Sequence, residues 1–154
     1  MTRQRIISLV LLIFLIGSIG VNLFLFLNLK KDRDFLDSKF RSDFGGISQS
    51  IDLFEGVSLT NETAIKNSVE IVSSLSSIYP YTSYKENKEL GQMLFNLKKF
   101  MVLESNKKVN DNTSMLKDYL TKIENNLDNK ALIAEFSNFL VSKTAFPMKA
   151  DGAK

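Results

Sequence analysis

The sequence predicts an all-α protein in which one N-terminal transmembrane helix continues into a stalk and is followed by a small antiparallel helical bundle. Residues 6–29 form a run of 24 residues without a charge, and apolar residues after that run recur three or four positions apart, which is the spacing of one helix face. The chain has only two prolines in 154 residues. No stretch alternates apolar and polar residues as a half-buried strand would.

The run over residues 6–29 is long enough to cross a membrane. Eighteen of its 24 residues are Leu, Ile, Val or Phe. A helix of this length reaches roughly 36 Å, and the hydrocarbon core of a membrane is about 30 Å thick. These apolar residues favour insertion by at most about 5–11 kcal/mol. We therefore predict an uncleaved transmembrane helix over 6–29, preceded by a short basic leader over residues 1–5.

A cleaved signal peptide is the alternative to this anchor. The apolar region of a signal peptide is about 7–15 residues long and ends in small residues, and the candidate cleavage site here is Ser18-Ile19-Gly20. Cleavage after Gly20 would leave a chain that begins VNLFLFLNL, whose apolar residues would need another partner. Because the chain has no cysteine, a lipidated N-terminal cysteine, a disulfide framework and thiol chemistry are excluded.

The basic residues that flank the apolar run support two different membrane orientations. Lys30, Lys31 and Arg33 outnumber Arg3 and Arg5, and the positive-inside count therefore favours a cytoplasmic C-terminal domain. A short basic leader before an apolar run is nevertheless the usual form of an uncleaved export signal, and long domains cross membranes largely regardless of charge. We expect a single-pass protein of the plasma (inner) membrane with an extracytoplasmic C-terminal domain, an orientation with which these three basic residues remain in conflict.

Residues 30–146 are predicted to form one helical domain, followed by a flexible tail over 147–154. A chain of this length is typical of a single domain, and no repeat or Gly/Ser-rich linker divides it. Five apolar stripes at helical spacing would share its core across short turns. The stripes are Leu36, Phe40, Phe44, Ile47, Ile51 and Phe54; Ile65, Val69, Val72, Leu75 and Tyr79; Leu90, Met93, Leu94, Leu97 and Met101; Leu116, Tyr119, Leu120, Ile123 and Leu127; and Leu132, Ile133, Phe136, Phe139 and Leu140.

Local residue types predict where these helices bend, begin and end. Glycine pairs can bend a helix, proline stops one, and Ser, Thr, Asp or Asn caps its first turn. The stalk helix is predicted to continue from the membrane helix, although Gly45-Gly46 could bend it. The other predicted features are a cap at Thr60 or Asn61, a stop at Pro80, a capping box over Ser83-x-x-Glu86, a polar turn over 105–114 and a cap at Asp128 or Asn129.

The composition removes most kinds of catalytic and binding site. The chain has no histidine, which excludes Ser-His and Cys-His nucleophile systems and paired-histidine zinc sites. Its seven glycines form no phosphate-binding or dinucleotide fingerprint. Without Arg3 and Arg5, 18 basic residues face 17 acidic ones, so that no basic nucleic-acid-binding face is predicted. We expect no enzyme activity, cofactor or metal, although a membrane-bound hydrolase with a serine-lysine pair stays open.

Two groups of residues are candidates for contacts with other proteins. Tyr79, Tyr81 and Tyr84 surround a proline in the turn IYPYTSY, and tyrosine is favoured in contact patches; alternatively, these rings cover the end of the bundle. Ser18 and Asn22 are four residues apart and share one face of the apolar helix. They could hydrogen-bond to another membrane helix, or they are simply tolerated there.

These features predict a non-enzymatic interaction or scaffold subunit of an envelope complex, of bacterial type. Its expected partners are the membrane and another membrane or envelope protein. The stalk phenylalanines could form the seam of a homo-oligomer or could equally pack in their own bundle. The alternative is a ligand-binding sensory helical domain that signals through a membrane partner. An anchored bundle with a core cavity resembles, in architecture, the extracytoplasmic input domains of bacterial receptors.

Overall fold

The computed structural model describes residues 3–52 and 58–144, with side chains described over 11–51 and 62–144. The all-α prediction is confirmed, because the described residues form six α-helices and two short 3-10 helices. The chain divides into two compact units, Met1–Phe35 and Leu36–Lys154. The predicted tail over 147–154, Phe54 and the first two residues of the leader lie outside the described residues.

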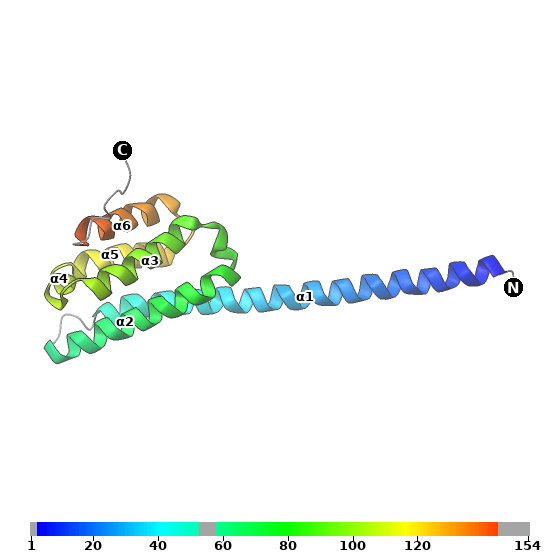
Figure 1. Ribbon diagram of the computed structural model, residues 1–154, viewed down its shortest axis with the longest axis horizontal. Coiled ribbons are helices and arrows are strands. Elements are labelled where there is room, and N and C mark those ends of the chain that lie inside the picture. The colour runs from blue at the N-terminus through cyan, green and yellow to red at the C-terminus, as the bar shows by residue number, and fades with distance from the viewer. Residues whose placement is uncertain (1–2, 53–57, 145–154) are drawn as a thin grey trace, which may run out of the picture. The chain divides into compact units, whose positions relative to one another are not determined.

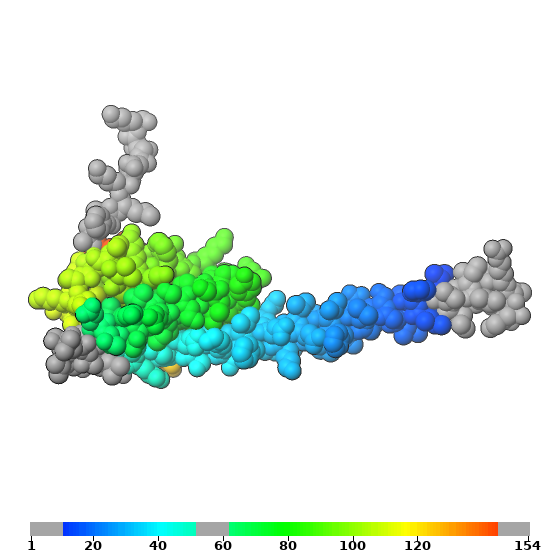
Figure 2. Space-filling view, turned by 60° about the horizontal axis from the view of Figure 1, so that its bottom comes forward, coloured from blue at the N-terminus to red at the C-terminus, as the bar shows by residue number. Residues whose placement is uncertain are grey.

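The first unit contains the apolar part of helix α1, which spans Arg3–Asp52. All fourteen large apolar side chains from Leu11 to Leu29 are 52–73% exposed, and Figure 2 shows the face of this blue segment that is turned toward the viewer. A helix that is apolar on every side has no face suited to water. Among the described residues, α1 is the one helix long and apolar enough to cross a membrane.

The second unit is a helical bundle that includes α1 from Leu36 onward. Figure 1 shows α2 and α3 side by side and running in opposite directions, while α6 packs along α3. The chain between α3 and α6 returns through two shorter helices. The elements after α1 are α2 (Ser58–Ile78), the 3-10 helices η2 (Tyr79–Tyr81) and η3 (Ser83–Glu86), α3 (Lys88–Leu103), α4 (Asn106–Asp111), α5 (Thr113–Asn125) and α6 (Lys130–Lys143).

The core of the bundle is built from the predicted stripes. The α1 stripe is inside, since Phe40, Phe44, Ile47 and Ile51 are each 0% exposed. Burying one such side chain stabilises the fold by about 1.5–3 kcal/mol. The later stripes add Ile65, Val72, Leu75, Leu90, Met93, Leu94, Leu97, Met101, Leu116, Leu120, Ile123, Leu127, Ile133, Phe136 and Leu140 to the same core, with Val69, Tyr79, Tyr119, Leu132 and Phe139 partly buried against it.

The start of α2 differs from the prediction, whereas its end and the start of α6 agree with it. Helix α2 begins at Ser58, so that Thr60 and Asn61 lie inside the helix and the predicted cap is wrong. The first turn of a helix accepts such polar residues because its N–H groups have no intrahelical partner. Helix α2 ends before Pro80, as predicted, and Asn129 caps α6 by accepting a hydrogen bond from the Leu132 N–H at 3.1 Å.

The predicted capping box over Ser83 and Glu86 is also wrong. These residues form η3, and α3 begins two residues later at Lys88. Contacts to α1 explain the difference: the Ser83 N–H donates to Asp37 Oδ1 at 2.7 Å, and the Tyr84 ring is buried beside α1. Tertiary contacts therefore override the local capping signal.

The polar segment over 105–114 contains a helix, α4, where a turn was predicted. Ser105 caps it by accepting a hydrogen bond from the Lys108 N–H at 3.3 Å, and Lys107 pairs with Asp111 at 2.6 Å. Val109 is 0% exposed and fixes α4 to the core. One apolar residue in ten produces no periodic signal, which is why the helix was missed.

Substituting alanine for two different glycines of the bundle should change the free energy of unfolding in opposite directions. A Cβ at Gly91 would lie 2.9 Å from Tyr79 Cε1, whereas a Cβ at Gly46 would meet its nearest atom at 3.7 Å. We expect Gly46→Ala to raise the free energy of unfolding by about 0.5–1 kcal/mol, because alanine favours a helix. Gly91→Ala should lower it, because displacing the ring costs about 1–3 kcal/mol. Urea unfolding of both variants measures this; equal stabilisation would contradict the close approach.

Candidate functional site

The three predicted tyrosines lie in one turn but differ in exposure. Tyr84 is 5% exposed, Tyr79 is partly buried and Tyr81 is 69% exposed. The Tyr84 ring lies 5.2 Å from the Phe40 ring, centroid to centroid, and the Arg41 guanidinium lies over it at 5.6 Å. The Arg41 Nε–H also donates to the Tyr84 hydroxyl. Tyr84 therefore fastens the turn to α1, and among these tyrosines Tyr81 presents the largest free ring surface.

Tyr79 stabilises the turn from within. Its hydroxyl lies 2.8 Å from the carbonyl oxygen of Asn87 and 3.0 Å from that of Lys85, so that one proton is shared between two acceptors. Burial raises the pKa of the Tyr79 hydroxyl above its usual value of 10.0, and the Glu86 and Glu89 carboxylates raise this pKa further. The protonated hydroxyl is thus the form that the folded turn favours.

This raised pKa predicts a loss of stability in alkali. A folded-state pKa above the unfolded value means that the contribution of Tyr79 is complete below pH 10.0 and is lost as the pH rises through the folded-state pKa. We expect Tyr79→Phe to cost about 0.5–1.5 kcal/mol at neutral pH and less as the pH rises above 10.0. Urea unfolding of both proteins at about pH 8 and pH 11 tests this; a constant difference would contradict it.

Three polar residues that hold the turn were not predicted. Asp37 and Arg41 reach it from α1, and the Asn87 Nδ2 group donates to the Leu127 carbonyl oxygen at 3.0 Å. Asn87 is 4% exposed. Charged residues beside an apolar stripe usually face solvent, and their partners here are more than forty positions away in the sequence, so that no local pattern marks them.

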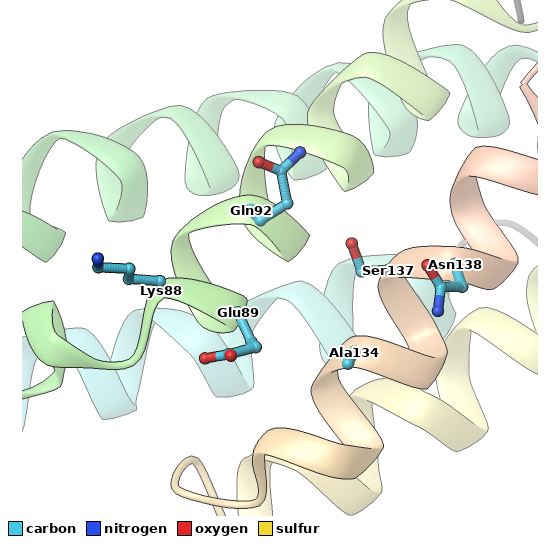
Figure 3. A pocket seen from close by; sticks show the side chains of 6 residues that line it. All are labelled: Lys88, Glu89, Gln92, Ala134, Ser137 and Asn138. Carbon is cyan, nitrogen blue, oxygen red and sulfur yellow. The ribbon is translucent and has the colours of Figure 1, made fainter.

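A shallow, open cleft of about 340 Å³, lined mainly by polar residue types, lies between α3 and α6 (Figure 3). Behind it, Asn96 donates to Ser137 Oγ at 2.7 Å and accepts a hydrogen bond from Gln92 Nε2 at 3.2 Å. Ser137 is 7% exposed, and Figure 3 shows its hydroxyl directed toward α3. The lining residues are Lys88, Glu89, Gln92, Ala134, Ser137 and Asn138.

The chemistry of this cleft suits hydrogen bonding to a small polar molecule. It offers two carboxamides, one hydroxyl, one cation and one anion. No group of three or more Asp, Glu, His or Cys side chains that could hold a metal ion occurs in the described part of the chain. The sequence did not reveal the cleft, because its two walls come from helices about forty residues apart.

The other predicted pair, Ser18 and Asn22, is joined within α1. Asn22 Nδ2 donates to the Ser18 carbonyl oxygen at 2.8 Å and lies 3.4 Å from Ser18 Oγ. Both side chains line a shallow groove on the helix surface, together with Ile13, Phe14, Gly17 and Val21. The structure therefore brings this pair together on one face, as the spacing predicts.

Comparisons of the chain with known proteins found no match, whether against protein-family models, curated proteins or solved structures.

Proposed function

We propose that this chain is a single-pass protein of the plasma (inner) membrane whose extracytoplasmic bundle is a non-enzymatic interaction or scaffold module for another envelope protein. The observation that supports this most is the apolar part of α1, whose large side chains from Leu11 to Leu29 are all more than half exposed. A membrane provides the apolar surroundings that these side chains lack. Anchoring also raises the effective concentration of the bundle near membrane partners.

Exposed apolar and aromatic side chains on the bundle are the best candidates for the contact with that partner. Tyr81 is 69% exposed, and Phe95 and Val102 on α3 are each 56% exposed. Phe95 and Val102 are seven positions apart and so lie on the same face of α3. The centres of protein interfaces are enriched in such aromatic groups, which can carry a large share of the binding energy.

The contact role of Tyr81 is tested by substitution after a partner has been captured. Crosslinking in native membranes, followed by identification of the recovered protein, supplies that partner. We expect Tyr81→Ala to lower its recovery by about tenfold or more, as loss of an aromatic hot spot costs about 2 kcal/mol or more. Lys85→Ala changes an exposed residue of the same turn and should leave recovery unchanged.

Two results would count against this proposal at different levels. Unchanged recovery with Tyr81→Ala in a folded bundle would remove the turn as a contact site. Crosslinking that recovers no other protein from native membranes would overturn the interaction function itself.

The proposed orientation has its own test. A reporter that is active only in the cytoplasm, fused after Lys154, should give no activity if the bundle is extracytoplasmic. Full reporter activity would place the bundle in the cytoplasm, as the basic residues Lys30, Lys31 and Arg33 favour.

The polar cleft between α3 and α6 supports a second candidate function, a ligand-binding sensory domain that signals through a membrane partner. The ligand would be a small polar molecule held by Gln92, Ser137 and Asn138 (Figure 3). Free amino acids and monosaccharides are suitable probes. A melting temperature that rises with one of them, and no longer rises in Asn138→Ala, would favour this function; no rise with either class would count against it.

A further inference from the structure

The face of α1 that carries Ser18 and Asn22 has a shallow groove, and Gly17 lines it. A Cβ built at Gly17 would meet no atom within 4 Å, while Phe14 and Val21 stand on either side in the groove. In a membrane, helices associate by close packing and interhelical hydrogen bonds, and small residues allow the backbones to approach. This face of α1 therefore combines a small residue with larger neighbours about one turn away, an arrangement that lets a second helix approach closely.

Asn22 supplies an independent indication that another helix covers this face. Its Nδ2 group donates to the Ser18 carbonyl oxygen at 2.8 Å, but its carboxamide oxygen accepts no hydrogen bond from the described residues. Inside the predicted span no water is present to pair with that oxygen, and leaving it unpaired costs free energy. A donor on a second membrane helix would remove this cost.

We propose that the occupant is a second copy of this chain, so that two α1 helices pair through the face formed by Gly17, Ser18, Val21 and Asn22. The hydrogen-bonding groups of this face are complementary to themselves: the Asn22 oxygen can accept from the Asn22 amide or the Ser18 hydroxyl of the other copy. A two-fold interface requires this kind of self-complementary patch. The inference rests on the proposed function, since it requires α1 to span a membrane.

Disulfide mapping in native membranes tests the pairing directly, because the full chain has no cysteine of its own. Single cysteines are placed in the groove, as Phe14→Cys, Ser18→Cys and Val21→Cys, and on the opposite side of the helix, as Ile16→Cys and Leu23→Cys. Two differently tagged copies are expressed together and oxidised. We expect a disulfide-linked product that carries both tags from the groove positions, and at least several-fold less from the opposite positions.

Matched substitutions separate packing from hydrogen bonding. Neither Gly17 nor Gly20 has an atom within 4 Å of an added Cβ, and Gly20 does not line the groove. We expect Gly17→Ile to suppress crosslinking through Ser18→Cys or Val21→Cys, whereas Gly20→Ile leaves it intact. Asn22→Leu, measured with Val21→Cys, should weaken association by roughly 3-fold to 15-fold, the range of single hydrogen bonds between membrane helices.

The outcomes distinguish this inference from the proposed function. Equal crosslinking on both sides of the helix, or none, in a chain that resists carbonate extraction would overturn the pairing and leave the anchor in place. Insensitivity to Gly17→Ile would also overturn it. Extraction of the wild-type chain by carbonate would instead overturn the proposed function, and the pairing with it.

Discussion

Phe40→Ala is expected to lower the free energy of unfolding of the bundle by about 3–5 kcal/mol, the usual cost of truncating a buried phenylalanine. Phe40 is 0% exposed. Its ring centroid lies 5.2 Å from that of Tyr84, 6.3 Å from that of Phe44 and 6.5 Å from that of Tyr79. Alanine would leave a cavity where α1 meets the tyrosine turn. Because small domains are stable by only about 5–15 kcal/mol, this loss is a large fraction of the total.

Urea unfolding followed by far-UV circular dichroism measures this effect, and the chain contains its own control. Phe95 is 56% exposed, so that Phe95→Ala makes the same chemical change at the surface and should alter stability by only about 0.5 kcal/mol. If the two substitutions had equal effects, Phe40 would not be a core residue.

The second large effect concerns the anchor. We expect the double substitution Ile16→Arg with Leu23→Arg to move the protein from the membrane fraction to the soluble or aggregated fraction. Near the centre of a span, each arginine costs about 2.5–3.5 kcal/mol and each lost Ile or Leu about 0.3–0.6 kcal/mol more. The sum, about 6–8 kcal/mol, is comparable with the whole insertion energy of about 5–11 kcal/mol estimated for residues 6–29.

Carbonate extraction and sedimentation distinguish the outcomes. The matched pair Ile16→Ala with Leu23→Ala keeps the span uncharged and should stay in the membrane pellet. Retention of the double-arginine variant in that pellet would mean that α1 is not held by insertion.

The helices were predictable from the sequence where the signal is local. The α1 stripe from Phe40 to Ile51 and the cap at Asn129 both arise from residues within one or two turns, and the structure has them as expected. Helix α4 has one buried apolar residue, Val109, which is too few to give a period. Helix α4 is stabilised by packing Val109 into a core that is formed by the other helices.

The candidate sites were predictable only in part, because most of their contacts join residues that are far apart in the sequence. The sequence locates the tyrosine turn, but the burial of Tyr84 depends on Phe40 and Arg41, more than forty positions earlier. Similarly, the cleft exists because Asn96 and Ser137, 41 positions apart, meet between α3 and α6. Such pairings follow from tertiary packing, which helical periodicity does not encode. Ser18 and Asn22 are four residues apart on one helix, and this local spacing alone predicts that they share a face.

The shared role of α1 has a consequence for how the protein is made. Four fully buried core residues, Phe40, Phe44, Ile47 and Ile51, belong to α1, which precedes the other helices of the bundle in the sequence. The residues that cover them are therefore synthesised later. Closing contacts over so many residues is slow compared with forming a helix. During synthesis this apolar stripe therefore stays exposed until α2 and the tyrosine turn, which contact α1 in the folded bundle, have been made.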